Sequence, residues 1–155
     1  PPEYLVLPGT LANGMKGETW GGTLVATWQA LADWRLQFQY AYLDFDLHLK
    51  EGSVDRNSLS VAGNSPQQQV AVYSFLELPA NFEFFTGLRY VDELPAQAVP
   101  DRIALDVSLG WYLREDLRLS LTVRDLADDT HPEFGEGRLI ERSAYLAATW
   151  SPSAP

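Results

Sequence analysis

Hydrophobic and polar residues alternate with a period of two along most of the chain, which is the pattern of half-buried β-strands. The clearest example begins at Arg102 and ends at Leu113, where every odd-numbered position is apolar and the even-numbered positions are Arg, Ala, Asp, Ser, Gly and Tyr. After a tight turn, residues 117–124 set three Leu and a Val against Arg, Ser, Thr and Arg. Each segment is therefore predicted to be a strand with one wholly apolar face.

Five other segments alternate in the same way and complete a set of seven predicted strands: Lys16–Leu31, Trp34–Tyr42, Gln67–Leu78, Phe82–Leu94 and Glu141–Trp150. The short piece Tyr4–Leu7 is a strand remnant. The best-patterned segments do not place apolar residues at helical spacing, and they are rich in Val, Thr, Tyr, Phe and Trp. The predicted fold is all-β, an antiparallel up-and-down meander of seven to eight strands.

The predicted connections alternate strictly between short and long. Three are tight turns, and three are longer and rich in Gly, Pro, Asn and acidic residues; the long ones are Glu51–Pro66, Pro95–Asp101 and Thr130–Ile140. A meander with this alternation places all short turns on one rim and all long loops on the other. Outer-membrane barrels show the same asymmetry, with short periplasmic turns and longer external loops.

Aromatic residues on the apolar faces gather at two heights. Four of the five Trp flank the predicted short turns or end the last strand at the same rim: Trp28, Trp34, Trp111 and Trp150. The remaining Trp joins three Tyr near the long loops: Trp20, Tyr40, Tyr42 and Tyr90. Two aromatic girdles around a Leu/Val/Phe band are typical of strands that cross a membrane, because amphipathic rings favour the interface with water.

Composition narrows the function classes. The formal charge is −10, with 11 Lys plus Arg against 21 Asp plus Glu, which argues against the phosphate-binding surface of a nucleic-acid partner. The absence of Cys excludes disulfide and thiolate chemistry. No stretch approaches the ~18 consecutive apolar residues of a transmembrane helix, but a transmembrane strand needs only about 9 to 11 residues.

The alternation is compatible with two architectures. In a soluble antiparallel sandwich or barrel the apolar face turns inward, whereas in a transmembrane barrel it contacts lipid and the polar face lines the interior. Three features favour the membrane barrel. The polar faces carry few charges among Gly, Ser, Ala, Thr and Gln, the chain has only two Lys, and the Trp residues gather at one height.

Residue patterns for catalysis or metal binding are weak, and we expect no enzyme activity, catalytic residue, cofactor or metal site. His48 and His131 fall in long-loop regions and are interpreted as solvated loop residues. The cluster Asp125, Asp128 and Asp129 is interpreted as a polar strand tip, with a cation contact as the alternative. The pair Gly21-Gly22 indicates close packing or a bulge within a strand.

Charged residues on the polar face define the candidate functional surface, which comprises Arg35, Arg89, Arg102, Arg118, Arg124, Glu83, Glu93 and Asp106. One interpretation is a polar lumen wall, which contacts a passing solute or an inserted plug. The other is a ladder of arginine–carboxylate pairs whose charges neutralise one another inside a barrel.

Several segments together resemble the C-terminal part of the barrel of TonB-dependent outer-membrane receptors, over about residues 13–150. The resemblance is carried by 13–18 entering a strand, 88–95, 105–111 followed by 117–126, 131–134, and 141–150. Family strands usually read Asn-Leu before the last external loop, so Asp125-Leu126 is a near match.

The resemblance implies a 22-stranded barrel with an N-terminal plug, located in the outer membrane of a Gram-negative cell and importing a siderophore, vitamin B12 or a similar nutrient. Residues 1–155 are then expected to be a single β-barrel segment, a fragment with no plug domain and no TonB box. Its implied partners are outer-membrane lipid, the remainder of the barrel and plug, and TonB through the absent N-terminal part.

Two alternatives remain open. One is a complete small eight-stranded outer-membrane barrel with a structural or adhesion role, which needs an eighth full-length strand. The other is a soluble lipocalin-like barrel that binds an apolar ligand, with its apolar face pointing inward.

Overall fold

The computed structural model describes residues 13–55, 58–135 and 137–151, and these form an all-β structure built on a seven-stranded antiparallel meander. Strand order in the sheet is β1-β2-β3-β4-β5-β6-β9, so each strand pairs with the next one of the meander. The strands are β1 Met15–Leu31, β2 Trp34–Leu49, β3 Gln68–Leu78, β4 Phe82–Val91, β5 Arg102–Arg114, β6 Leu117–Arg124 and β9 Ser143–Trp150. The predicted meander is confirmed, while the remnant Tyr4–Leu7 lies outside the described residues.

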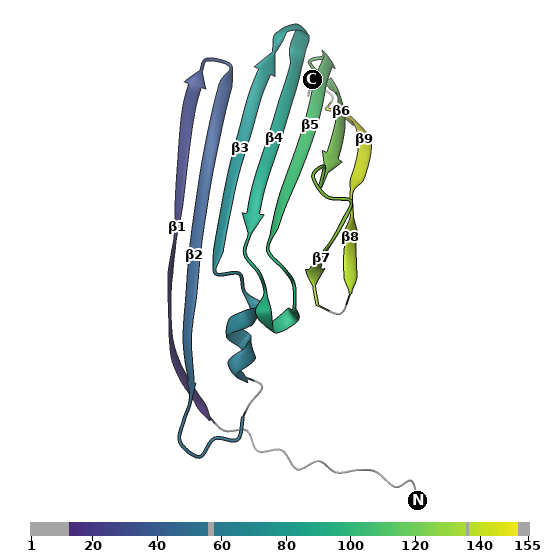
Figure 1. Ribbon diagram of the computed structural model, residues 1–155. Helices are drawn as coiled ribbons and strands as arrows, with labels where there is room; N and C mark the ends of the chain where they lie inside the picture. Colours follow the sequence, from purple (N-terminus) through teal and green to yellow (C-terminus); the bar gives the residue numbers. More distant parts are fainter. Residues whose placement is uncertain (1–12, 56–57, 136, 152–155) are drawn as a thin grey trace, which may run out of the picture.

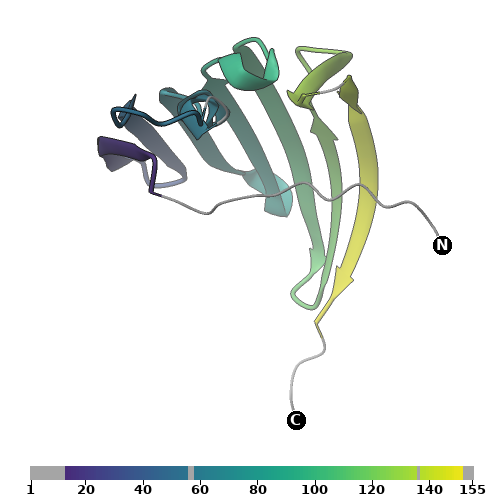
Figure 2. The same ribbon diagram turned by 90° about the horizontal axis from the view of Figure 1, so that it is seen from below.

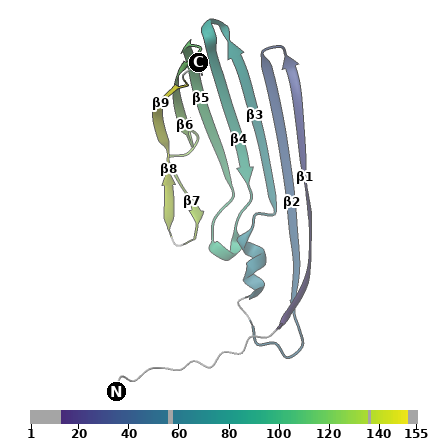
Figure 3. The same cartoon turned by 180° about the vertical axis from the view of Figure 1, so that it is seen from behind.

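The sheet is an open, curved wall. Figures 1 and 3 show the strands side by side from β1 to β9, and Figure 2 shows the curvature of the sheet seen along the strands. β1 and β9 are the two edges, and within the described residues they pair with no strand beyond β2 and β6, respectively. Among the same residues, no helix is long and apolar enough to cross a membrane.

The register places the alternating apolar residues on one continuous face. Directly paired residues of an antiparallel sheet project from the same face. One row of paired positions runs across six strands as Trp34, Leu76, Phe84, Leu109, Leu121 and Leu146. The adjacent row, one residue away on each strand, projects from the opposite face as Arg35, Phe75, Phe85, Ser108, Thr122 and Tyr145.

The apolar face is the exposed one and the polar face holds the buried residues, which is the reverse of a water-soluble fold. Large apolar side chains on the apolar face are exposed, for example Leu88 at 46% and Leu121 at 44%. The buried hydrophobic residues of the sheet, Ala71 and Ala104, lie instead on the polar face, where they flank Arg89 in the register. Within the described residues nothing covers the apolar face, so the meander has no hydrophobic core of the usual kind.

Short and long connections alternate as predicted. Residues 32–33, 79–81 and 115–116 make the short-turn rim, and the described residues of the long connections, 50–55, 58–67, 92–101, 125–135 and 137–142, make the long-loop rim. In Figure 1 the short turns lie at the top. The Pro79–Asn81 turn places both Ala80 and Asn81 at positive φ, a conformation that L-residues adopt at some cost.

Several predicted boundaries need correction. The second strand continues past Tyr42 to Leu49, because Met15–Trp20 of β1 pairs with this acidic extension although its alternation is broken. The predicted strand Phe82–Leu94 ends at Val91, before Pro95. A 3-10 helix, Ser58–Asn64, lies inside one predicted long loop, and another contains most of a separate hairpin of β7 Thr130–Phe134 and β8 Arg138–Glu141. Glu141, the predicted start of the last strand, belongs to β8, and the last strand begins at Ser143.

The interpretation of Gly21-Gly22 is half right. At Gly21 an added Cβ would lie 2.3 Å from the carbonyl oxygen of Tyr42, so the two backbones approach closely there. Gly22 faces open space, and the register irregularity of this strand pair lies between Gln29 and Leu31.

Candidate functional site

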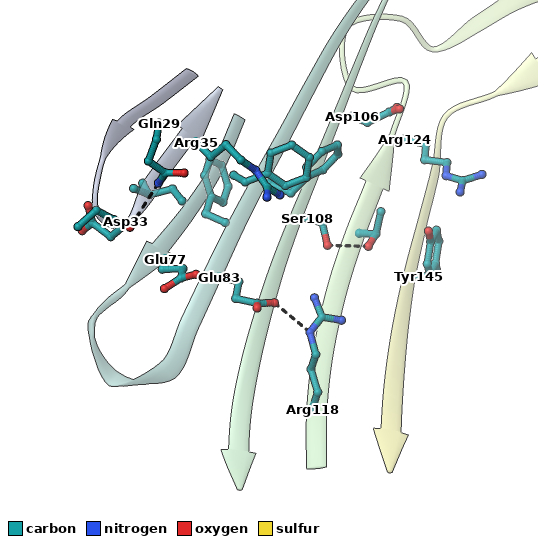
Figure 4. Close-up of a pocket in the computed structure, with 16 residues that line it drawn as sticks. Gln29, Asp33, Arg35, Glu77, Glu83, Asp106, Ser108, Arg118, Arg124 and Tyr145 are labelled. Atoms are coloured by element: carbon teal, nitrogen blue, oxygen red, sulfur yellow. Dashed lines mark hydrogen bonds and ion pairs between the residues drawn. The ribbon is translucent and has the colours of Figure 1, made fainter. Parts of the chain in front are cut away.

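The candidate functional site is a pocket of about 660 Å³ on the polar face of the sheet, so this face is the concave one. Side chains from β1, β2, β3, β4, β5, β6 and β9 line it, as Figure 4 shows. A smaller hollow of about 140 Å³ continues along the same face toward the long-loop rim, between Gln39, Ala71 and Arg89. The polar face therefore forms a trough rather than a flat wall.

Aromatic rings form one part of the trough. The Phe75 and Phe85 ring centroids lie 5.2 Å apart, and the Tyr73 ring stacks with that of Phe85 at a centroid distance of 6.1 Å. The guanidinium of Arg35 lies 4.6 Å from the centroid of Phe75. This cation–π contact holds the Arg35 side chain against the floor, and among the described residues no carboxylate pairs with it.

A cross-strand ion pair closes the short-turn end of the trough. Arg118 on β6 donates from Nε to Glu83 on β4 at 3.2 Å, passing over β5, which lies between them. The crossing occurs at Gly110, where an added Cβ would lie 2.6 Å from the Arg118 guanidinium. Gly110 therefore provides the space that this pair needs.

Asp106 on β5 is the most connected carboxylate of the trough. One oxygen accepts a hydrogen bond from Nη2 of Arg89 at 3.0 Å, and the other accepts from the backbone N–H of Asp125 at 3.1 Å. Asp125 follows the last residue of β6 and has φ 55°, so the chain turns away from the sheet at this point. Asp106 thus links the floor of the trough to the end of β6.

The β6–β9 side of the trough is neutral or cationic. Ser108 and Thr122 join their hydroxyls at 2.9 Å, and the guanidinium of Arg124 lies 5.7 Å from the ring centroid of Tyr145. Arg124, like Arg35, has no carboxylate partner among the described residues. Two of the five predicted lumen arginines are therefore held by aromatic rings, whereas Arg89, Arg102 and Arg118 are held by carboxylates.

The three carboxylates predicted for the candidate functional surface do not all lie in the trough. Glu83 and Asp106 line the trough, but Glu93 lies beyond the end of β4, beside Asp44 and Asp92 in a separate hollow at the long-loop rim. The arrangement presents mixed charge, hydroxyls and aromatic surface to whatever fills the concavity. Nowhere in the described parts of the chain do three or more His, Cys, Asp or Glu side chains form a group that could hold a metal ion.

The interpretation of His131 as a solvated loop residue is wrong. His131 lies in β7, its side chain is 5% exposed, and its Nε2 lies 2.7 Å from Nη1 of Arg102 on β5. A guanidinium can only donate, so Nε2 accepts and the ring proton is on Nδ1. The same guanidinium also pairs with Glu133, which makes an Arg102–His131–Glu133 clasp between the hairpin and the sheet.

His48 is solvent-exposed, as predicted, but it lies in a strand and not in a loop. It lies in β2, near the end of the extension, and forms an exposed contact with Asp46 at 3.0 Å. The contact belongs to the outer part of the sheet and is far from the trough in the register.

The acidic cluster after β6 does not converge on one point. Asp128 accepts a hydrogen bond from the Thr130 N–H at 3.3 Å, and Asp129 pairs with Arg142 at 2.8 Å. Asp125 is buried, and its Oδ1 has no hydrogen-bond partner. Each carboxylate has a different local role, which agrees with a polar strand tip.

Gln97 was missed by sequence reasoning, yet it joins three loops at the long-loop rim. Its amide nitrogen donates to Asn64 at 3.3 Å, and its amide oxygen accepts from the Gly135 N–H at 3.1 Å. The backbones of Gly63 and Ala96 also meet closely, because a Cβ at Gly63 would lie 2.8 Å from the Ala96 nitrogen. A polar residue in a Pro-rich loop gives no pattern from which such contacts can be predicted.

Comparisons with known proteins identified no relative of this chain. No protein-family model, no curated protein and no solved structure matches the chain. The described residues form an antiparallel all-β meander with an exposed apolar face and a polar, concave face.

Proposed function

We propose that this chain is a wall segment of a transmembrane β-barrel in the outer membrane, with its apolar face in contact with lipid and its trough facing the barrel interior. Within that class we propose the C-terminal barrel segment of a TonB-dependent receptor for uptake of a siderophore, vitamin B12 or a similar nutrient. The single observation that carries the membrane assignment is the combination of an exposed apolar face with a concave polar one. The receptor assignment rests on the sequence resemblance.

The height of the apolar band supports this placement. On β4 the apolar face runs from Phe82 to Tyr90, eight residue steps, or about 27 Å at ~3.4 Å per step. A strand tilted by about 40° crosses about 21 Å of membrane over that length, close to the ~25 Å apolar band of outer-membrane barrels. The band on Trp34–Tyr42 of β2 has the same length.

The hydrogen bonds of the girdle aromatics give independent support, because most of the Trp indole and Tyr hydroxyl groups that form one bind a polar group at a rim of the sheet. The Trp150 indole donates to Asp116 in a short turn at 2.9 Å. At the other height the Tyr90 hydroxyl donates to Asp92 at 3.2 Å and the Tyr40 hydroxyl to Gln68 at 3.4 Å. Aromatic side chains with one apolar and one hydrated end are suited to a membrane interface.

The lipocalin-like alternative requires the apolar face on the concave side, where it would surround a ligand. The concave side instead carries the Arg89–Asp106 and Arg118–Glu83 pairs. The eight-stranded alternative depends on a strand at Tyr4–Leu7, outside the described residues. Neither has a specific observation in its favour.

The test is a nitroxide scan of β5, which is straightforward because the chain contains no Cys. Single Cys variants at 105, 106, 107, 108 and 109 are refolded in lipid vesicles and spin-labelled. We expect oxygen accessibility to peak at 105, 107 and 109, and accessibility to a water-soluble nickel chelate to peak at 106 and 108. The chain should also acquire β-sheet circular dichroism only with detergent or lipid.

A water-soluble, monodisperse β-sheet protein that shields positions 105, 107 and 109 from both relaxation reagents would contradict the membrane assignment. The receptor assignment is tested separately. The gene that encodes this sequence in its native genome should also encode a preceding plug domain, and deletion of that gene should abolish growth on one scarce nutrient.

A further inference from the structure

The Arg102–His131–Glu133 clasp contains a hydrogen bond that forms only while His131 is uncharged. Nε2 of His131 lies 2.7 Å from Nη1 of Arg102, and a contact between two nitrogens at this distance requires a free lone pair on the imidazole. A protonated imidazole carries a hydrogen on both ring nitrogens, so two donors and two positive charges would then face each other. The contact is therefore available to the neutral ring alone.

The net charge of the clasp also changes with this proton. While His131 is neutral, the Arg102 guanidinium and the Glu133 carboxylate balance each other, and Nη2 of Arg102 donates to Oε1 of Glu133. After protonation two cations share this carboxylate, whose Oε1 lies 3.6 Å from Nε2 of His131. The side chains of His131, Arg102 and Glu133 are 5%, 18% and 32% exposed, so water solvates the added charge poorly.

The hairpin supplies no second anion for a protonated His131. Among the described residues, Glu133 is the only carboxylate at ion-pair distance from this ring. Ile140 of β8 stands opposite His131 in the register and is an apolar neighbour. Glu141 pairs with Thr130, one residue before His131, and so projects from the other face of the hairpin.

The acidic residues beside the clasp on the sheet side are directed elsewhere. Asp101 precedes Arg102 in the chain and faces the hydroxyl of Tyr90. Asp129, in the segment that leads into β7, pairs with Arg142 at 2.8 Å. The charge balance at His131 is therefore set by the three members of the clasp.

Two other contacts hold the hairpin, and neither contains a histidine. The backbone N–H of Gly135, at the outer end of the hairpin, donates to Gln97 at 3.1 Å. At the base, Arg142 pairs with Asp129 and donates from Nε to the Asp125 carbonyl at 3.3 Å. Loss of the clasp leaves the base attached, but it leaves a single neutral hydrogen bond, worth about 1 kcal/mol, at the outer end.

We propose that protonation of His131 opens the clasp and detaches the β7–β8 hairpin from β5. Imidazole is the side chain whose charge changes near neutral pH, and the neutral ring makes the contact, so the hairpin is held at higher pH and released at lower pH. Arg102 shares the concave face of β5 with Ala104 and Asp106. Acid therefore frees the long-loop end of this face, whether or not the apolar face contacts lipid.

The test follows protonation and release separately in the whole chain, refolded in whichever medium gives β-sheet circular dichroism. The sequence has two histidines, so a His48→Gln variant leaves one set of imidazole signals in the NMR spectrum, that of His131. Nitroxides at Leu139→Cys on the hairpin and Glu115→Cys in a short turn report the distance between the hairpin and the far end of β5. Between about pH 8 and about pH 5 we expect a narrow distance distribution to become broad, with the same midpoint as the His131 signal.

Substitutions in the clasp provide the matched controls. His131→Gln keeps a hydrogen-bond acceptor that never becomes charged, so it should hold the hairpin at both pH values. Arg102→Ala should give the broad distribution at both. Amide protection factors in β7 and β8, corrected for the pH dependence of intrinsic exchange, should fall about tenfold or more on acidification of the parent chain and stay constant in the His131→Gln variant.

Four results would overturn the proposal: a His131 signal that does not titrate in this range, a hairpin that stays in place after the signal has titrated, release with a different midpoint, or pH-dependent release that persists in the His131→Gln variant. If the Gln side chain does not reach Arg102 and the hairpin is free at both pH values, the two midpoints in the His48→Gln chain decide. Failure of the membrane assignment leaves these outcomes unchanged, since the clasp needs no lipid.

Discussion

The guanidinium of Arg102 and the imidazole of His131 form a 2.7 Å contact that joins the first residue of β5 to the β7–β8 hairpin. The contact is buried, because the side chains are 18% and 5% exposed, respectively. It lies where β5 extends beyond its pairing with β6, and there the hairpin, which forms a separate two-stranded sheet, contacts β5 through side chains. Part of the longest C-terminal connection is in this way fixed to the wall of the sheet.

We predict that Arg102→Ala releases the hairpin without unfolding the meander. A buried hydrogen bond from a charged donor contributes about 2 kcal/mol, and Glu133 and His131 both lose their partner. Limited proteolysis should cut within residues 130–141 at least tenfold faster, while the circular dichroism of the sheet stays unchanged. Arg114→Ala is the control, because its pair with Asp116 is exposed and should contribute well under about 1 kcal/mol.

Asp106→Ala should destabilise the sheet by about 2–3 kcal/mol, because it leaves the Asp125 N–H without its acceptor and Arg89 without its carboxylate. Glu83→Ala removes an ion pair whose carboxylate is more exposed, 41% against 19% for Asp106, and should cost about 1 kcal/mol or less. Urea unfolding in micelles, followed by Trp fluorescence, measures both. Equal losses for the two variants would contradict the central position that we assign to Asp106.

The sequence predicted the meander well because the apolar face is continuous. In Arg102–Arg114 every second residue faces the same medium, so the period-two signal is uninterrupted. The same reasoning failed for β7, because Pro132 and the polar residues Thr130 and Glu133 interrupt any apolar alternation. This strand forms through its contacts with β8 and Arg102. The reasoning also failed for the end of β2, because strand pairing continues there after the apolar alternation has stopped.

The sequence predicted the residues of the candidate site and offered arginine–carboxylate pairing as one interpretation, but it did not predict which residues pair. Alternation placed Arg118 and Glu83 on the polar face, yet their pairing depends on Gly110 leaving room for a side chain to cross β5. The aromatic contact of Arg35 with Phe75 likewise depends on the β2–β3 register, which the length of a long connection does not determine. Such contacts follow from tertiary geometry and carry no local sequence signal.

Ala80→Gly is expected to stabilise the protein. Ala80 has φ 60°, and the left-handed region costs an L-residue about 1 kcal/mol or more, whereas glycine adopts it freely. Part of that gain is lost to the greater freedom of glycine in the unfolded chain, so we expect a net gain of about 0.5 kcal/mol. Ala32→Gly, in a short turn where φ is negative, is the control and should lower the stability.

Substitution by arginine distinguishes the two faces most directly. Leu88 lies on the apolar face of β4 between its midpoint, Thr86, and Tyr90, and Gln39 lies on the polar face of β2 at a comparable height, since Gln39 pairs with Ala71 and Leu88 with Val72. If the apolar face contacts lipid, Leu88→Arg should cost about 1–3 kcal/mol in vesicles, because the cost of a cation falls from ~2–4 kcal/mol at the bilayer midplane to ~0–1 kcal/mol near the interfaces. Gln39→Arg should change the stability by less than about 1 kcal/mol, because the trough already holds arginines. The loss at Leu88 should also be larger in lipids with long acyl chains than in short-chain detergent, where the apolar layer is thinner and an arginine reaches water by extending its side chain. Equal tolerance at both positions would mean that the apolar face does not contact lipid.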